Sequence, residues 1–268
     1  MLRLDLDARL RQFVLGAPLA DKADPGHLRV MTYNTHRGAN RFGVLDLEAI
    51  AATIEACRPD VVALQEVDRH WGDRSQGVDQ PAWYARRLGM PVNFFPTIVG
   101  TAPAGTDHRP EYGLALLSRW PATAPPDHQH YSGPPAAEPR GLQRVSIVVG
   151  DPSGAPHTLR VINTHLCVRG SRLRTAQVAE LLAYADSPGD PPTVVAGDFN
   201  AVRRSRSQRQ VRTTYRDAWD AGHGLPGTML GRRIDYLWMS HHLHPVQTVV
   251  VRSRASDHFP VVSDLSWS

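Results

Sequence analysis

The chain has 268 residues, which is long enough to bury a sizeable core in one large domain or two small ones. Its apolar content of 41% is ordinary for a globular protein, and no apolar run approaches the roughly 20 residues that a membrane-spanning helix needs. The formal net charge of +4 rests mainly on arginine, since Lys22 is the one lysine, and it permits nucleic acid or acidic lipid as a partner.

An N-terminal extension, residues 1–27, is predicted to precede a main domain that spans residues 28–268. The extension ends in the loop-forming Asp24-Pro25-Gly26, and a helix on the protein surface is the one regular element it could form. It has no apolar segment of the signal-peptide kind, so the default expectation is a cytoplasmic protein. Two cysteines make no disulfide framework, and a monomer is the default expectation.

The first half of the main domain alternates strand and helix signals. A helix is predicted after Asp46, whose side chain suits the N-cap and which is followed by Glu48 in the first turn. A second helix is predicted from Asp79 to Leu88, with Pro81 near its start. Runs of apolar residues predict four strands, at 28–34, 60–64, 92–97 and 112–117.

The second half is predicted to be richer in strands. A Pro-rich loop over 121–139 comes first, followed by strands over 143–149 and 158–163 that a Pro-Ser-Gly turn joins. A helix begins at Ser171. The remaining strands are predicted at 193–197, 234–239, 246–250 and 259–265. Many strands with few helices between them indicate a layered α/β domain.

Polar residues stand at the end of a hydrophobic strand, or directly beside one, at six places. They are Asn34 in VMTYNTHRG, Glu66 in VVALQEV, His165 in RVINTHL, Asp198 and Asn200 in TVVAGDFNAV, Asp235 in RRIDYLW, and Asp257 and His258 in ASDHFPVV. Each one alone is typical of a turn or a solvated strand end. Asp235 is harder to explain in this way, because a carboxylate inside an apolar run needs a partner. The repetition favours a shared function over six separate turns.

The residue types favour a hard cation. Carboxylate and amide oxygens are the ligands that Mg²⁺ or Mn²⁺ prefers, and few protein ligands are enough because Mg²⁺ keeps several waters and takes substrate phosphate oxygens. No Cys/His spacing resembles a closed zinc site. The histidines are therefore expected to contact phosphate or to orient a water beside a carboxylate.

In this order the motifs resemble those of the endonuclease/exonuclease/phosphatase superfamily. The resemblance covers roughly residues 28–265 and rests on the ordered set Asn, Gln-Glu, Tyr-Gly…Leu-Ser-Arg, Thr-His-Leu, Gly-Asp-Phe-Asn, Arg-Ile-Asp-Tyr and Ser-Asp-His. It implies a deoxyribonuclease I-like four-layer α/β sandwich, in which two mixed β-sheets pack face to face with helices outside. The strand ends would meet at one cleft, and residues 28–268 would form the catalytic domain.

The resemblance also implies a metal site and a reacting group. Asn34 and Glu66 would hold Mg²⁺ or Mn²⁺, with Asp257 nearby as the third metal residue. Asp198 would orient or deprotonate the attacking water. How the base and metal roles divide among these carboxylates stays open.

The phosphate contacts follow from the same resemblance. Asn200 would donate to the phosphate, and His165 and His258 would contact it. Asp235 would hold His258 in place.

Two further residues have alternative interpretations. Tyr112, in EYGLALLSR, either hydrogen-bonds a phosphate oxygen or packs in the core. Arg140, in EPRGLQRV, is either a phosphate fork or a surface arginine.

The basic stretch VRRSRSQRQVRTTYR, residues 202–216, bears on the substrate. It is either a solvated loop and helix or a surface that follows a polyanion backbone, with Arg203, Arg204 and Arg206 as candidate phosphate contacts. We therefore expect a metal-dependent phosphodiesterase that uses in-line attack of water, with nucleic acid slightly favoured as the substrate. The alternative is a phosphodiesterase or phosphatase of a phospholipid or small phosphorylated headgroup, for which Trp71, Trp83 and Tyr84 could form an apolar lip. Packing within its helix is the other interpretation of Trp83. A non-catalytic binding module is disfavoured, because no catalytic position is lost.

Overall fold

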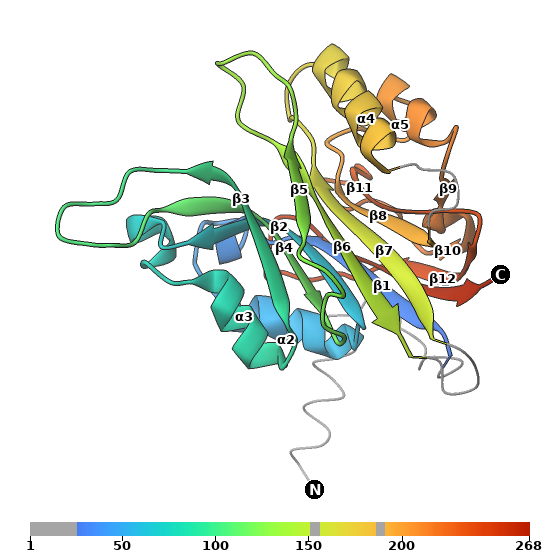
Figure 1. Ribbon diagram of the computed structural model, residues 1–268, viewed down its shortest axis with the longest axis horizontal. Coiled ribbons are helices and arrows are strands. Elements are labelled where there is room, and N and C mark those ends of the chain that lie inside the picture. Colours follow the sequence, from blue (N-terminus) through green and yellow to red (C-terminus); the bar gives the residue numbers. More distant parts are fainter. Residues whose placement is uncertain (1–25, 151–155, 186–190) are drawn as a thin grey trace, which may run out of the picture.

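The computed structural model describes residues 26–150, 156–185 and 191–268 (Figure 1). The helix predicted in the N-terminal extension and the Pro-Ser-Gly turn at 152–154 both lie outside these residues. Across the described ranges, no helix is long and apolar enough to cross a membrane. The strands of the described residues form two mixed sheets, one of seven strands and one of six.

The seven-stranded sheet carries the N-terminal half of the chain and its last strands. Its strands, in spatial order, are β10 (Gly222–His223), β12 (Leu243–Val250), β13 (Val261–Trp267), β1 (Leu28–Asn34), β2 (Val61–Arg69), β4 (Glu111–Ser118) and β3 (Val92–Val99). At its centre β1 and β2 are parallel, and the flanking strands β13 and β4 are antiparallel to them. The carboxyl ends of β1 and β2 therefore meet at the same edge of the sheet.

The six-stranded sheet carries the middle of the chain. Its strands, in spatial order, are β5 (Asp127–His130), β6 (Gly141–Val149), β7 (His157–His165), β8 (Thr193–Asp198), β11 (Asp235–Met239) and β9 (Arg216–Asp217). The prediction of a continuous loop over 121–139 is wrong, because β5 lies within it. The sequence of β5, Asp-His-Gln-His, has no strand pattern and stays largely exposed, so pairing with the backbone of β6 decides its structure.

Two pairs of helices cover the outer faces of the sheets, α2 and α3 over the seven-stranded sheet and α4 and α5 over the other (Figure 1). The predicted N-caps of the first pair are confirmed, since Asp46 and Asp79 each accept a hydrogen bond from the backbone N–H three residues on, at 2.9 Å. The helices are α2 (Leu47–Cys57), α3 (Gln80–Leu88), α4 (Ser171–Ala185) and α5 (Arg206–Val211), with short 3₁₀ turns η1 (His36–Gly38), η2 (Gly72–Ser75) and η3 (Ala218–Ala221).

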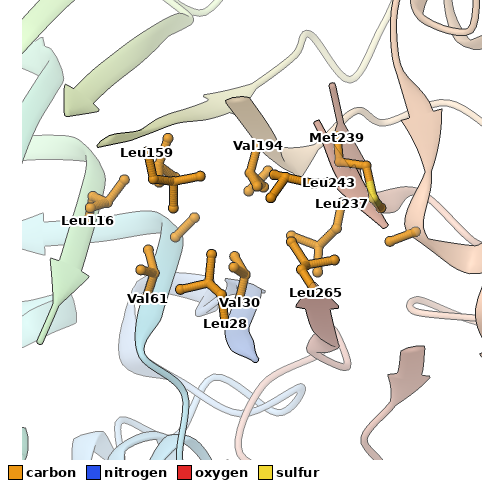
Figure 2. Close-up of a cluster of buried hydrophobic side chains, with 14 of the residues drawn as sticks. Leu28, Val30, Val61, Leu116, Leu159, Val194, Leu237, Met239, Leu243 and Leu265 are labelled. Carbon is orange, nitrogen blue, oxygen red and sulfur yellow. The ribbon is translucent and has the colours of Figure 1, made fainter. Parts of the chain in front are cut away.

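Side chains that alternate between the two faces of the central strands fill three separate apolar layers. In β1, Val30 packs between the two sheets, whereas Met31 packs on the helix side. In β8, Val194 enters the same inter-sheet core (Figure 2) and Val195 packs toward α4. Because successive side chains of a strand point to opposite faces, each central strand fills two layers at once. The predicted four-layer α/β sandwich is confirmed.

Two buried amides join the sheets next to the ends of their strands. Gln65 Nε2 donates to Asn163 Oδ1 at 2.8 Å, and Asn163 Nδ2 donates to the backbone oxygens of Leu64 and Ala115 at 2.9 and 3.0 Å. These bonds satisfy polar groups that would otherwise be buried without partners. They also hold β2 and β7 at a defined separation, one residue before Glu66 and two residues before His165.

Candidate active site

Strand register brings three of the predicted site residues side by side. Asp198, the last residue of β8, is paired with His165 on parallel β7 and with Asp235 on antiparallel β11. Gly197 allows this close approach, because a Cβ at that position would lie 2.0 Å from the carbonyl oxygen of Thr164. The polar residues that the sequence separates by more than thirty positions thus stand on neighbouring strands.

An irregularity in the other sheet directs Glu66 into the same place. The register between β2 and β4 shifts between Leu64 and Val67, and Glu66 within this shift has a positive φ of 56°. Such bulges re-aim a side chain at the edge of a site, and a non-glycine residue with a positive φ is uncommon within a strand. Asn34 connects the two sheets here, since its Nδ2 donates to Glu66 Oε1 at 3.0 Å and to Asp198 Oδ2 at 3.2 Å.

The side-chain amide of Asn34 does not offer its oxygen as a metal ligand, unlike the carboxylates of Glu66 and Asp257, the other residues predicted to hold the metal. Its Oδ1 accepts a hydrogen bond from the backbone N–H of His36 at 3.0 Å, so the amide presents an N–H donor to the two carboxylates. Burial by itself would raise the pKa of Glu66, but the Asn34 hydrogen bond and nearby positive charges lower it. Glu66 is consequently ionised at neutral pH.

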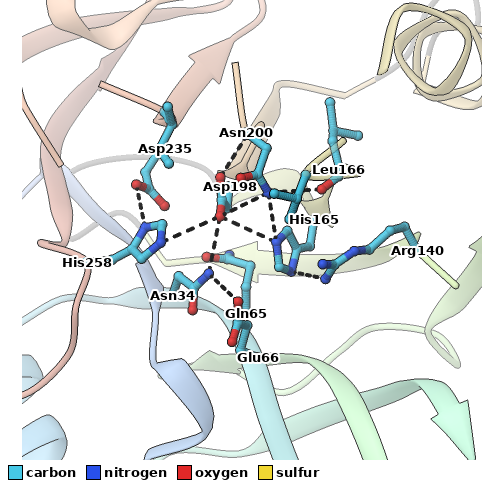
Figure 3. A network of polar contacts seen from close by, with 12 residues as sticks. Asn34, Gln65, Glu66, Arg140, His165, Leu166, Asp198, Asn200, Asp235 and His258 are labelled. Atoms are coloured by element: carbon cyan, nitrogen blue, oxygen red, sulfur yellow. Dashed lines mark hydrogen bonds and ion pairs between the residues drawn. The ribbon is translucent and has the colours of Figure 1, made fainter. Parts of the chain in front are cut away.

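Asp198 is a buried carboxylate surrounded by donors (Figure 3). Its Oδ1 accepts from the backbone N–H of Asn200 at 2.8 Å, and its Oδ2 lies 3.3 Å from Asn200 Nδ2 and 3.4 Å from His165 Nε2. Burial favours the protonated form, but the hydrogen bond from His165 and the charge of His258 outweigh it and hold the pKa of Asp198 at about 2. Asp198 is therefore ionised throughout the physiological range.

His258 lies between two carboxylates, as Figure 3 shows. Its Nδ1 is 2.9 Å from Asp235 Oδ2, and its Nε2 is 3.9 Å from Asp198 Oδ2. Burial disfavours the charged ring, but the negative charges of Asp235 and Asp198 outweigh this effect and raise the pKa of His258 to about 10. The predicted partnership of Asp235 with His258 is present as a hydrogen bond, and the ring is an imidazolium at neutral pH.

The second histidine has a different partner. Arg140 is 4% exposed, so it is no surface arginine, and its Nη1 lies 2.6 Å from His165 Nδ1. A guanidinium can only donate, so Nδ1 accepts in this contact and the ring proton sits on Nε2, 3.4 Å from Asp198 Oδ2. Asn200 Nδ2 is also 3.1 Å from Nε2, but its own hydrogens are directed to Leu166 O and Asp198 Oδ2. Arg140 also donates to the hydroxyl of Tyr112 at 3.4 Å. Arg140 thereby fixes the orientation of the His165 ring, with Nε2 toward Asp198.

One cleft of about 640 Å³ is lined by the predicted site residues Glu66, Tyr112, Arg140, Asp198, Asn200, Asp257 and His258. Asn34, His165 and Asp235 are buried and are not among its lining residues. Asp257 lies on its wall, a quarter exposed, with its carboxylate 3.9 Å from His36 Nδ1. Tyr112 lines the cleft although its side chain is buried, so it packs as one interpretation predicted, and its contact with a phosphate oxygen stays a prediction. Five arginines of the described chain reach this cleft: Arg37, Arg74, Arg140, Arg174 and Arg232.

Two groups of residues could hold a cation: the buried Asp198, Asp235 and His258, and the pair Glu66 and Asp257 in the cleft. The donor atoms of Asp198, Asp235 and His258 lie within 4.8 Å of one another, but here the imidazole occupies the space between the carboxylates and bonds to one of them. Glu66 and Asp257 instead present oxygen atoms to the open cleft. The second pair matches the oxygen ligands that Mg²⁺ and Mn²⁺ prefer.

The basic stretch, residues 202–216, does not contribute its candidate phosphate contacts to the cleft, whereas the sequence motifs do. Arg203, Arg204 and Arg206 are exposed and are not among the residues that line the cleft. Arg206 instead lines a separate surface hollow with Arg209, between α4 and α5. Their role as phosphate contacts stays a prediction that concerns the surface outside the cleft.

The sequence motifs left out two residues of the cleft wall that form a stacked pair. Trp71 and Arg74 lie in the loop after β2, and the guanidinium carbon of Arg74 is 4.2 Å from the centre of the Trp71 ring. Of the three residues of the predicted apolar lip, only Trp71 lines the cleft, because Trp83 packs against the core of the α2–α3 layer and Tyr84 is buried in it. No pattern in the sequence singles out Arg74 among 30 basic residues.

The sequence matches the Endonuclease/Exonuclease/phosphatase family over residues 31–258, which is most of the chain. The protein belongs to this family. Members of the family are hydrolases that act on phosphoester bonds and generally depend on a divalent metal ion, and the protein is accordingly an enzyme of this class. No functionally curated protein matches the chain.

Solved structures share the fold over nearly the whole chain. An endonuclease/exonuclease/phosphatase from Beutenbergia cavernae DSM 12333 is 27% identical, with a TM-score of 0.76 over 90% of this chain and 72% of that one. The human Nocturnin catalytic domain with a bound sulfate anion is 24% identical, with a TM-score of 0.68 over 92% and 96%. A mannosyl-6-phosphatase from Bacteroides thetaiotaomicron VPI-5482 is 19% identical, with a TM-score of 0.65 over 90% and 100%. The last two likenesses concern the fold alone.

Proposed function

We propose that the protein hydrolyses a phosphodiester by attack of water in line with the leaving oxygen, with residues 28–268 as the catalytic domain. The observation that carries this proposal is the ionised carboxylate of Asp198 at the base of the cleft, with hydrogen-bond donors on three sides. A phosphoryl group needs little covalent help from a protein, so catalysis rests on positioning and on charge stabilisation.

Asp198 orients the attacking water. Its pKa of about 2 makes it a weak base at neutral pH, because a general base is most effective when its pKa lies near the working pH. It accepts a hydrogen bond from the water and aligns the water's lone pair with phosphorus. Of the two roles considered from the sequence, orientation is therefore the stronger one.

The phosphate oxygens meet donors from three residues. His258 offers a cationic Nε2–H, His165 offers the Nε2–H that faces Asp198, and Asn200 offers its Nδ2, which in the free site donates to Leu166 O and Asp198 Oδ2. Donors fixed before the substrate arrives are worth more than mobile ones, since they need no reorganisation as charge develops. Asp235 acts on the reaction only through the orientation and charge of His258.

Glu66 and Asp257 are the residues we propose to hold a divalent cation, with Asn34 positioning Glu66 through its Nδ2–H. The lowered pKa of Glu66 and the all-oxygen donor set suit Mg²⁺ or Mn²⁺. Such an ion would polarise a phosphate oxygen and offset its charge.

Nucleic acid remains slightly favoured as the substrate, because five arginines of the described chain surround a cleft whose reaction uses only one phosphate. A phospholipid or small phosphorylated headgroup is the second candidate. One feature favours it: Leu230, 88% exposed, lies at the cleft rim beside Met229 and could contact an acyl chain.

A substrate panel tests the proposal. Bis(p-nitrophenyl) phosphate, single-stranded DNA, RNA and phospholipid vesicles would be incubated with Mg²⁺, with Mn²⁺ or with a chelator. We expect turnover with either ion, none with the chelator, and a loss of about 10²–10⁴-fold in Asp198→Asn while its circular dichroism and melting temperature stay near wild type. Undiminished turnover in Asp198→Asn would remove Asp198 from the mechanism, and restoration by Zn²⁺ alone would overturn the assignment of the metal.

A further inference from the structure

Trp71 and Arg74 form a wall between the catalytic cleft and a second hollow. Both residues line the cleft of about 640 Å³, and both also line a neighbouring open hollow of about 370 Å³. That hollow is bounded as well by His70, Pro103 and Pro110. A substrate arm that leaves the reaction centre in this direction must pass over the wall.

The wall is rigid before any ligand arrives. Arg74 donates through Nε and Nη2 to the two oxygens of Asp68, at 2.9 and 2.7 Å, and Asp68 is fully buried. This bidentate pair fixes the guanidinium plane, which stacks on the indole at 4.2 Å. The indole in turn meets Tyr112 edge-on, with ring centres 6.2 Å apart. Little side-chain entropy is left to be lost on binding.

The wall is also continuous with the reaction centre. Tyr112 accepts a hydrogen bond from Arg140, and Arg140 holds His165 beside Asp198. A phosphate at the donors of the site would therefore have the wall as its neighbour on the side of Tyr112.

Stability explains Arg74, which pairs with the buried Asp68, but it gives little reason for the indole stacked on it. Trp71 is partly exposed, and the Arg74 side chain keeps 37% of its surface accessible. By contrast, Trp83 packs against the core of the α2–α3 layer and Tyr84 is fully buried in it. A partly exposed indole and a guanidinium held flat beside an anion site are the surfaces on which heteroaromatic rings stack.

We propose that Trp71 and Arg74 form a stacking subsite for the base of a nucleotide unit next to the scissile phosphate. The position of that phosphate is taken from the proposed function, on which the subsite therefore rests. The subsite adds that the substrate is a nucleotide or nucleic acid. A lipid headgroup or a sugar phosphate has no planar heteroaromatic ring and would make no base-stacking contact with this wall.

Binding of two ligands that differ only in the base tests the subsite. Adenosine 5′-phosphate and ribose 5-phosphate share the phosphate and the sugar, and their affinities can be measured by titration calorimetry with Ca²⁺ present. We expect adenosine 5′-phosphate to bind about 5- to 100-fold more tightly, the range that one stacked base provides.

Matched variants test whether the wall causes the difference in affinity between the two ligands. In Trp71→Leu the affinity for adenosine 5′-phosphate should fall to that of ribose 5-phosphate, whose own affinity should not change, while Trp71→Phe should keep most of the preference. Trp267→Leu, which changes an indole stacked on His157 and away from the cleft lining, is the control and should behave as wild type.

The outcomes separate the subsite from the function on which it rests. Equal affinities for the two ligands in the wild type, or equal weakening of both by Trp71→Leu, would overturn the subsite while the phosphate site stands. Failure of both ligands to bind would overturn the phosphate site, and with it the proposed function and the subsite.

Discussion

Asp235 stands directly across from Asp198 in the antiparallel pair of β8 and β11, and the imidazole of His258 lies between their carboxylates. Two buried carboxylates on adjacent strands would repel each other if nothing separated them. The cationic ring offsets this repulsion, and its orientation is fixed by the shorter contact, to Asp235. The charge of His258 and the ionisation of Asp198 therefore depend on each other.

Replacing Asp235 with Asn should lower the pKa of His258 from about 10, because the nearest charge that favours the imidazolium is lost. The measurement is a titration of the His258 ring protons by NMR, in protein freed of metal by a chelator. His128, which does not line the cleft, serves as an internal control whose titration should not move. A His258 pKa that stays at its wild-type value or rises would show that Asp235 has another partner.

The same ion pair should make stability depend on pH. The pKa of His258 is about 10 in the fold against 6.5 as the ordinary value, so the pair stabilises the fold fully below about pH 6.5. Its contribution is lost as the pH rises through about 10. Urea unfolding at several pH values should show a decline over this window that is steeper in wild type than in Asp235→Asn, and parallel curves would contradict it.

Arg140 should determine the tautomer of His165. In protein labelled with ¹⁵N in histidine, the Nδ1 of His165 should have the shift of an unprotonated acceptor and Nε2 that of a protonated nitrogen. Arg140→Met should release this constraint and lower turnover, because Nε2–H is the group aimed at the site. Arg140→Lys keeps a donor and should retain more activity than Arg140→Met. A proton on Nδ1 in the wild type would refute the assignment.

The basic stretch and the cleft can be tested separately through salt dependence. If Arg203, Arg204 and Arg206 follow a polynucleotide backbone, changing all three to Ser should reduce the slope of log affinity against log salt by about 0.7–0.9 for each lost contact. Turnover of bis(p-nitrophenyl) phosphate should stay at the wild-type level, because these residues do not line the cleft. Arg86→Ser, an exposed change in α3, is the control. If the triple variant keeps the wild-type slope of log affinity against log salt, a phospholipid or small phosphorylated headgroup becomes the favoured substrate.

Gly197→Ala should destabilise the fold. The new Cβ would lie 2.0 Å from the Thr164 carbonyl oxygen, so β7 and β8 would have to separate where His165 and Asp198 meet. Overpacking of this kind costs about 1–3 kcal/mol, which corresponds to a melting temperature roughly 2–12 °C lower in a chain of this size. Gly150→Ala has no atom within 4 Å of the new Cβ and should melt as wild type does. Equal melting of the two variants would show that the strands can adjust.

The sequence by itself determined the local elements of the protein: its central strands, two helix starts and the ordered polar motifs. Apolar runs predicted the central strands, Asp46 and Asp79 predicted two helix starts, and the ordered polar motifs predicted the family and the sandwich fold. Each of these signals lies within a few consecutive residues, because side-chain alternation and capping are set by near neighbours in the chain. The apolar run around Asp235 indicated that this carboxylate needs a partner, and the family resemblance implied that the partner is His258.

Contacts between distant segments are what only the tertiary structure decided. The strand β5 exists because β6 offers its edge, and Arg140 is buried because Tyr112 and His165 close over it. Trp71 became part of a cleft wall, and Arg206 lies outside that cleft although it follows the Asp-x-Asn motif closely. The physical reason is the same in each case: the burial, charge and tautomer of a side chain depend on which strands and loops meet around it, and that is a property of the folded arrangement that no run of neighbouring residues contains.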